Sequence, residues 1–578
     1  MRIPFFPKYI REKELQACVL KDCSVVIDGQ NFLYNMYEES KMPFAFGCES
    51  DKFAAYLKSR LNKFKNANVK CYFVFKGGDM NIERKLKKME NNNDGEKFDF
   101  VENNKFVSPL LMKEVYKQVF DELGVPYAVC EFESKRECVA LAEQLKCAVV
   151  SNDIEFCFLK APYIHYQTLD YNHKMKKIDC LQYRRDNFLK KHLLTEQKLA
   201  IFAILTDTYL FPADVFNDLL KSLGALHSDF YKRYTALWQW LSKQDETVAV
   251  EFINNFLNQG DREKFASEMY SVMDFMQTKR QSSVADYLLN GGKLDIKPKD
   301  PIWFEKGVVS KQIAIPYINL YSYNYLFGQD TVESKSSRNS MLLSMDIVKY
   351  AYNLLTDFKR EEFTYLIGSK EVKIGAKRAT PKAIQKVFAD GWVDIKKMGL
   401  FENFLKENSI SEALVAQVPD DAAMLIIALV YFARKKAADN VTVDREVYSV
   451  ITCFVMLAEN RDILKNDRDE ASKAMRAYFN VSRGEVMRIF DRELLHNFLE
   501  FQKCLQHLNY LNVLCGSPYK PTIYHRAYNG TFVYKLFYEM RSADDCAAFV
   551  NNLLNGFTPV LNYRYFCKTT IHNYFYLV

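Results

Sequence analysis

The alternation of short apolar runs with helical stretches over the first 225 residues constrains the fold most strongly. Residues 24–28 form a β-branched, mostly apolar run typical of a buried parallel strand, and residues 69–75 form a second one. Further strands are expected at residues 127–129, 148–151 and 163–166, with helices at 108–123 and 138–145 between them. Such alternation predicts an α/β domain with a parallel sheet covered by helices on both faces.

The pattern changes from about residue 190, where apolar residues recur at helical spacing. Residues 302–329 look like a connector that contains Tyr and Pro, and a Ser-rich stretch follows at 334–340. Because 578 residues are too many for one hydrophobic core, we expect several domains. We place an α/β domain at 1–225, a helical extension at 226–300 and an α-helical C-terminal domain at 301–578.

The composition indicates an intracellular protein without a membrane segment. The 14 cysteines are scattered and form no C-x-x-C pair, which argues against a zinc site and fits a reducing compartment. The first residues have no apolar h-region, and the longest apolar stretches, 424–433 and 447–458, are shorter than a membrane helix. Nuclear and cytoplasmic locations both stay open. The net charge of +7 is too dilute to indicate nucleic-acid binding by itself.

Several acidic residues follow the predicted strands, where ligands collect in open α/β sheets. Asp28 closes the first strand, Glu133 follows residues 127–129, and Asp153 and Glu155 follow residues 148–151. Carboxylates that converge from separate strand ends are what a two-metal phosphodiesterase needs to activate water. Taken singly, each acid is more typical of a turn former or a helix cap than of a metal ligand.

Three of these runs resemble the flap-endonuclease (XPG-type, PIN-like) nuclease superfamily: Val-Val-Ile-Asp-Gly at 25–29, Phe-Val-Phe-Lys-Gly-Gly at 73–78 and Ser-Asn-Asp-Ile-Glu-Phe at 151–156. Within it the chain is most similar to the asteroid family, also through Gln-Lys-Cys-Leu at 502–505 and Ala-Tyr-Asn-Gly at 527–530. The resemblance implies a flap-endonuclease-like sheet, Mg²⁺- or Mn²⁺-dependent DNA cleavage if the site is active, and a link to epidermal growth factor receptor signalling.

Placed on the family pattern residue by residue, the metal site is incomplete. The implied catalytic residues and metal ligands are Asp28, Glu133, Asp153 and Glu155, with Asp207 as a further metal ligand. Lys76, Lys135 and Thr208 occupy positions where the family has acids. The helix-hairpin-helix glycines that grip DNA are not recognisable in residues 210–223.

Counting formal charges shows how much the replacement of acids by lysines and a threonine changes the site. The seven family acids would carry −7, whereas the matched positions here carry −2, or −3 if Asp207 is admitted. An ammonium group close to a metal position repels the ion by several kcal/mol, about 4 at 4 Å for an effective dielectric near 20. We therefore hypothesise that Lys76 and Lys135 pair with Asp28 and Glu133 and take the place of the metals.

Two alternatives stay open at this point. Glu131 and Glu133 also form a Glu-x-Glu pair, two residues before the position that the resemblance favours, and in that register fewer positions depart from the family. A reduced site at Asp153, Glu155 and Asp207 would hold a single ion.

Local basic runs are the candidates for nucleic-acid contact. One covers residues 58–88 and the other residues 174–191, and each is equally consistent with a solvated helix face. The residues that we assign to nucleic-acid binding are Lys63, Lys65, Arg84, Lys85, Lys87 and Lys88. Residues 84–88 fall where related nucleases carry a basic helical arch over the substrate.

Two functional hypotheses follow. The first is a binding or scaffold protein of the asteroid type with a degraded metal site, whose helical C-terminal half holds a protein partner. The second is a metal-dependent, structure-specific nuclease that acts on branched or single-stranded DNA with a reduced set of carboxylates. Loss of the second-strand acid at Lys76 favours the first hypothesis, and the acids Asp153 and Glu155 support the second.

Overall fold

The computed structural model describes residues 3–83, 85–86, 106–212, 214–227, 229–277, 279, 281–294, 302–328, 338–367, 370–376, 388, 392, 395–459 and 470–554. The chain divides into two compact units. The first, here called the sheet unit, comprises Met1–Phe32, Leu61–Lys76 and Val125–Gly292. The second, the helical unit, comprises Leu33–Arg60, Gly77–Gly124 and Lys293–Val578. The domain boundaries at 225 and 300 stay a prediction.

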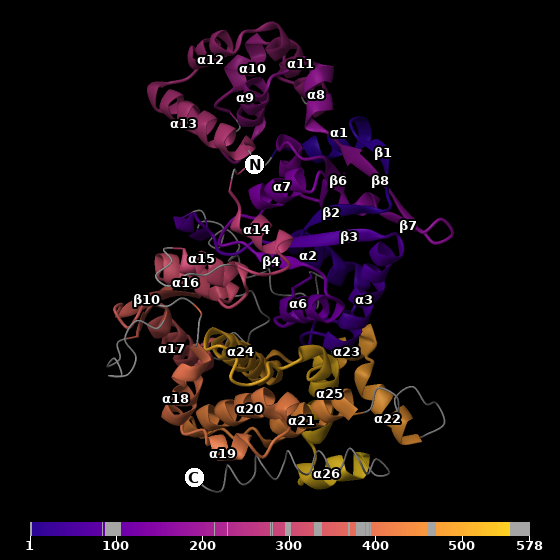
Figure 1. Cartoon of the computed structure of the whole chain (residues 1–578), viewed down its shortest axis with the longest axis vertical. Coiled ribbons are helices and arrows are strands. Elements are labelled where there is room, and N and C mark those ends of the chain that lie inside the picture. Colours follow the sequence, from indigo (N-terminus) through magenta and orange to yellow (C-terminus); the bar gives the residue numbers. More distant parts are fainter. Residues whose placement is uncertain are drawn as a thin grey trace. The chain divides into compact units, whose positions relative to one another are not determined.

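The sheet unit is built on one eight-stranded mixed sheet (Figure 1). Its strands are β1 (Gln16–Leu20), β2 (Cys23–Asp28), β3 (Val69–Phe75), β4 (Tyr127–Val129), β5 (Ala148–Ser151), β6 (Tyr163–His165), β7 (Asp170–Asn172) and β8 (Lys177–Tyr183). Their order is β1-β8-β6-β5-β2-β3-β4, and β7 pairs with β8. Strands β6, β5, β2, β3 and β4 are parallel neighbours, whereas β8 is antiparallel to β1, β6 and β7.

The centre of this sheet is apolar because both of its faces are covered. Ile27 of β2 is paired with Phe73 of β3 on one side and with Val150 of β5 on the other, and all three are fully buried. This explains the continuous β-branched runs that predict buried parallel strands. The register also places Asp28 beside Val74, at the carboxyl end of β2.

Helices make up the rest of the sheet unit. They are α1 (Phe6–Lys13), α7 (Lys135–Gln144), α8 (Arg185–His192), α9 (Glu196–Thr206), α10 (Asn217–Ser222), α11 (Phe230–Lys243), α12 (Glu246–Asn254), α13 (Gln259–Met276) and α14 (Ser283–Leu289). The helices α2 (Gly29–Ser40) and α3 (Ser50–Asn66) each contribute residues to both units. Short polar caps begin many of these helices, as Thr195 does by accepting a hydrogen bond from the amide of Lys198.

The helical unit contains α6 (Met112–Leu123), α15 (Trp303–Val309), α16 (Ile315–Tyr323), α17 (Met345–Leu355), α18 (Leu400–Glu407), α19 (Glu412–Val415), α20 (Asp420–Ala438), α21 (Asp444–Glu459), α22 (Glu470–Phe479), α23 (Arg483–Ile489), α24 (Arg492–Leu514), α25 (Gly530–Met540) and α26 (Cys546–Leu553). A small sheet of β9 (Tyr325–Phe327), β10 (Glu362–Ile367) and β11 (Lys370–Gly375) completes it. Packed helix pairs are α20 with α24 and α21 with α25 (orange to yellow in Figure 1).

The prediction of a parallel sheet followed by a large, mostly helical region is confirmed. The apolar stretch 424–433 is the buried centre of α20, and no helix among the described residues is long and apolar enough to cross a membrane. The expectation of a connector at 302–329 was incomplete, because α15, α16 and β9 lie there. Pro316 is tolerated in the first turn of α16, where a helix needs no amide donor.

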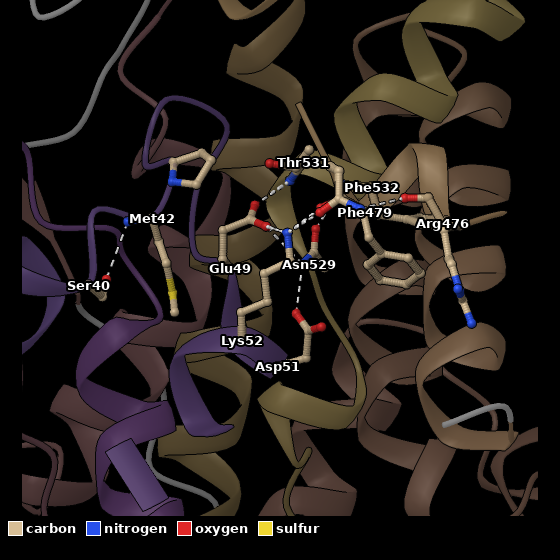
Figure 2. Close-up of polar contacts among 12 residues, drawn as sticks. Ser40, Met42, Glu49, Asp51, Lys52, Arg476, Phe479, Asn529, Thr531 and Phe532 are labelled. Carbon is tan, nitrogen blue, oxygen red and sulfur yellow. Dashed lines mark hydrogen bonds and ion pairs between the residues drawn. The ribbon is translucent and has the colours of Figure 1, made fainter. Parts of the chain in front are cut away.

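A buried carboxylate ties the segment around residue 49 to the start of α25 within the helical unit. The side chain of Glu49 accepts hydrogen bonds from the amide of Thr531 at 2.9 Å and from the side-chain amide of Asn529 at 3.1 Å, as Figure 2 shows. The ammonium of Lys52 lies 3.2 Å from the same carboxylate. Glu49 is fully buried. The backbone at Phe46 lies so close to Gly530 that a Cβ on Gly530 would be 2.5 Å from the Phe46 carbonyl oxygen, which leaves no room for a side chain there.

Candidate functional site

The acidic and basic residues selected from the sequence gather at the carboxyl ends of the parallel strands in the sheet unit. Asp28 is the last residue of β2, and Lys76 follows β3 directly. Glu133 lies between β4 and α7, and Lys135 is the first residue of α7. Asp153 follows β5 and caps the short helix Ile154–Phe158, which contains Glu155. This is the edge of an open α/β sheet at which ligands normally bind.

Asp28 is the most deeply buried of these acids. Its Oδ2 accepts a hydrogen bond of 2.8 Å from the hydroxyl of Ser151, and only 6% of the residue is exposed. Burial raises the pKa of Asp28 to about 6, although the Ser151 hydrogen bond opposes that shift. The Ser151 hydroxyl also accepts from the amide of Asp153 at 3.0 Å, so it links the first-strand acid to the turn after β5. Ser151 was not selected from the sequence, although it ends a predicted strand beside Asp153.

Lys135 forms the central ion pairs of the site. Its Nζ lies 2.9 Å from Oδ2 of Asp153 and 2.6 Å from Oε2 of Glu155, and only 18% of the Lys135 side chain is exposed. Burial alone would lower the pKa of Lys135, but the two carboxylates outweigh it and raise that pKa. Burial would likewise raise the pKa of Glu155, and Lys135 lowers it instead. Lys135 and Glu155 therefore each favour the charged form of the other.

Lys76 pairs with Glu133, with 2.8 Å between Nζ and Oε1. This pair is more open to solvent than that of Lys135, since half of the Glu133 side chain is exposed. Both lysines thus form ion pairs with acids of the set. The sequence hypothesis names Asp28 and Glu133 as the partners of the two lysines. Glu133 does pair with Lys76, whereas Asp28 is bonded to Ser151 and Lys135 reaches the acids after β5.

Asp207 and Thr208 follow α9 in the sheet unit. Asp207 is buried, and its Oδ1 accepts a hydrogen bond of 2.7 Å from the amide of Tyr209. This bond stabilises a local turn. Asp207 and Thr208 also line a small pocket with Phe211, Phe216 and Tyr234. Within the described part of the chain, no group of three or more His, Cys, Asp or Glu residues is arranged to hold a metal ion. The metal-ligand assignments, the single-ion site and the alternative register through Glu131 stay predictions.

The side chains present do not fit a two-metal centre. Mg²⁺ and Mn²⁺ are held by oxygen ligands, and a two-metal site needs several carboxylates facing the ions. Here the ammonium groups of Lys76 and Lys135 contact Glu133, Asp153 and Glu155. The carboxylate charge of those three acids is thus already largely balanced by the protein itself.

The candidate DNA-binding lysines differ in their local contacts. Lys63 and Lys65 occupy the last turn of α3, where positive charge also favours the helix dipole, and Lys65 is exposed. Lys85 lies 3.2 Å from Asp79 and covers the ring of Phe327 at 5.5 Å. Arg84, Lys87 and Lys88 lie outside the described residues.

The parallel sheet with these strand ends gives the fold class, which is an α/β fold of the flap-endonuclease-like type. A model of the XPG N-terminal domain matches residues 6–95, and a model of the asteroid N-terminal domain matches residues 457–573. The chain is 22% identical to single-strand DNA endonuclease ASTE1 of Danio rerio over 91% of the chain and 80% of that protein. The human ASTE1 is also 22% identical, over 89% of the chain and 82% of that protein.

A shorter match links the chain to protein asteroid of Drosophila melanogaster, 31% identical over 28% of the chain and 19% of that protein. Among solved structures, the catalytic core of Rad2 in complex with DNA substrate is 14% identical with a TM-score of 0.29, covering 50% of this chain and 99% of that one. Human GEN1 in complex with Holliday junction DNA is 15% identical with a TM-score of 0.31, covering 56% and 78%. The chain is thus similar to asteroid-family proteins and to the XPG N-terminal domain, the resemblance that its sequence motifs indicate.

Proposed function

We propose that this asteroid-family chain is a binding protein whose nuclease-type site is held together by lysine ion pairs in place of divalent metals. The observation that carries the proposal is the position of Lys135, within 3 Å of both Asp153 and Glu155. Lys76 acts in the same way on Glu133. A site whose carboxylates are neutralised by ammonium groups has little affinity left for Mg²⁺ or Mn²⁺. Without an ion, no water is activated for attack on a phosphodiester.

The ligand that we propose is single-stranded or branched DNA. The names of the relatives support DNA as the ligand, since those proteins are called single-strand DNA endonucleases. The exposed Lys65 and the half-exposed Lys63 on α3 supply positive charge for phosphate contact. We assign a protein partner to the helical unit, and a role in receptor signalling rests on the asteroid resemblance alone. The cysteines of the described residues are unpaired, which supports an intracellular location.

A second candidate function is metal-dependent cleavage of the same DNA. It is favoured by the relatives' names, because the similarity to the ASTE1 endonucleases extends over about nine-tenths of the chain. It is also favoured by the acids Asp28, Asp153 and Glu155, which are present at the strand ends. In this case substrate or metal must displace Lys135 from Asp153 and Glu155.

A cleavage assay separates the two functions. The full chain is incubated with single-stranded, flap and hairpin DNA and either Mg²⁺ or Mn²⁺, beside the Asp153→Ala variant prepared in the same way. We expect equal background from both proteins, together with DNA binding by fluorescence anisotropy that persists in EDTA. Cleavage by the wild type that disappears in Asp153→Ala would establish the nuclease and refute the proposal. An absence of DNA binding in either condition would refute the choice of ligand.

A further inference from the structure

Two cysteines face each other across the antiparallel strands β1 and β8 of the sheet unit. Cys18 is paired directly with Cys180, in a register that also pairs Gln16 with Gln182 and Leu20 with Ile178. Residues directly opposite in an antiparallel pair have Cα atoms about 4.5–5.5 Å apart. A disulfide spans Cα atoms about 4.4–6.8 Å apart. The backbone therefore already has the spacing that a disulfide requires.

The two thiols also differ in accessibility: one is partly open to solvent, and the other is buried beside it. Cys18 lies on β1 at the end of the strand order and is half-buried, so a small solute reaches it from solvent. Cys180 lies behind it, 5% exposed, with its Sγ 3.5 Å from the carbonyl oxygen of Cys18. The first thiol is thus positioned to react with an oxidant and the second to react with the first.

Other cysteines of the sheet unit lack this geometry. Cys23 begins β2 opposite Val69, and Cys71 of β3 is opposite Val25. Among the strand pairs of the described residues, Cys18 and Cys180 are the only cysteines directly opposite each other. The strand pairs of the described residues therefore contain no second pair of cysteines with this spacing.

We propose that Cys18 and Cys180 are a reversible oxidation site that forms a cross-strand disulfide with a peroxide. The Cys18 thiolate attacks the peroxide O–O bond, giving a sulfenic acid on Cys18 and releasing hydroxide or an alkoxide. The Cys180 sulfur then attacks the Cys18 sulfur, the S–O bond breaks, and water leaves with the Cys180 proton. The two thiols are oxidised by two electrons and the peroxide is reduced. The new bond fastens β1 to β8, and a thiol reductant reverses it.

The test is peptide mapping of the full chain after treatment with hydrogen peroxide and alkylation of the remaining thiols under native conditions. The expected result is a cross-linked peptide pair containing Cys18 and Cys180, with an intact mass lower by about 2 Da and restored by dithiothreitol. Cys18→Ser changes a half-buried residue on an edge strand and should abolish the cross-link while the protein stays folded. In Cys180→Ser, dimedone should trap a sulfenic acid on Cys18.

Cys23→Ser is the matched control, since Cys23 is another half-buried cysteine of the same sheet and the cross-link should persist without it. Alkylation of Cys18 in the peroxide-treated wild type, to the same extent as in the untreated protein, would overturn the proposal. A cross-link from Cys18 to Cys23 in place of Cys180 would overturn it as well.

Discussion

The two units of this chain each hold carboxylates beside lysines, but in different surroundings. Glu49 of the helical unit is fully buried and accepts two hydrogen bonds from the chain near the start of α25, in addition to its ion pair with Lys52. Asp153 of the sheet unit is 31% exposed at its side chain, lies at a strand end, and pairs with Lys135. A buried carboxylate that joins distant segments supports the fold, whereas a partly exposed one at a sheet edge can change partner at little cost to the fold.

The largest effect is expected at the buried end of this comparison. Glu49→Ala removes the acceptor for the amide of Thr531 and leaves Lys52 and Asn529 without that carboxylate. We expect the helical unit to lose about 3–5 kcal/mol of unfolding free energy. Urea unfolding followed by hydrogen exchange of the peptides from α25 measures it. The control Glu38→Ala changes an exposed glutamate on α2 and should stay within about 0.5 kcal/mol, and equal effects at both positions would contradict this account.

Breaking the ion pairs at the sheet edge should cost less. Lys135→Ala takes the ammonium group away from Asp153 and Glu155, but both carboxylates reach solvent and can hydrate. We expect a loss of about 1–2 kcal/mol in the sheet unit. Lys160→Ala is the control, since its ion pair with Glu143 is exposed and long at 3.8 Å. A loss as large as that of Glu49→Ala would mean that the Lys135 pairs are structural.

The third prediction concerns how the stability of the helical unit depends on pH. Burial lowers the pKa of His507 to about 3, so the folded state holds it neutral below the ordinary value near 6.5. The unfolded state then binds more protons, and stability should fall as the pH drops from about 6.5 towards 3, by up to about 1.4 kcal/mol per pH unit. His507→Gln should flatten this part of the profile. An unchanged slope in hydrogen exchange of α24 between pH 6 and 4.5 would contradict the assignment.

The smallest effect concerns the surface lysines. Lys65→Ala should lower single-stranded DNA affinity only modestly and reduce the slope of log K against log salt by about 0.7, the value for one phosphate contact. Lys243→Ala is a matched control, because Lys243 is also exposed in the last turn of a helix. Anisotropy titrations at several salt concentrations measure both. Identical slopes for the two variants would remove α3 from the proposed DNA surface.

The strands of the sheet were predictable where their sequence is continuously apolar, as in β2, which ends at Asp28. The strand β1 was not predicted, since most of its residues are exposed and its sequence lacks a buried run. The set of acids and lysines at the sheet edge was also predictable, because the carboxyl ends of parallel strands meet at one edge.

The partners within that set were not predictable. Lys135 and Glu155 are separated by 20 residues, and only the placement of α7 beside the end of β5 brings them together. The link between Glu49 and Thr531 spans 482 residues, so no local pattern reveals it. Sequence periodicity indicates which side chains are buried. Which of several equally charged acids a lysine pairs with depends on distances in the folded chain.

The most direct test of the central claim is a calorimetric titration of Mn²⁺ into the wild type and into the double variant Lys76→Asp/Lys135→Glu. Removing two ammonium groups from the acids should strengthen Mn²⁺ binding at least about tenfold, since each group opposes the ion by several kcal/mol. The wild type should give no more heat than the Asp153→Asn variant. Tight binding by the wild type that is lost in Asp153→Asn, or no gain in the double variant, would contradict the replacement of metal by lysine.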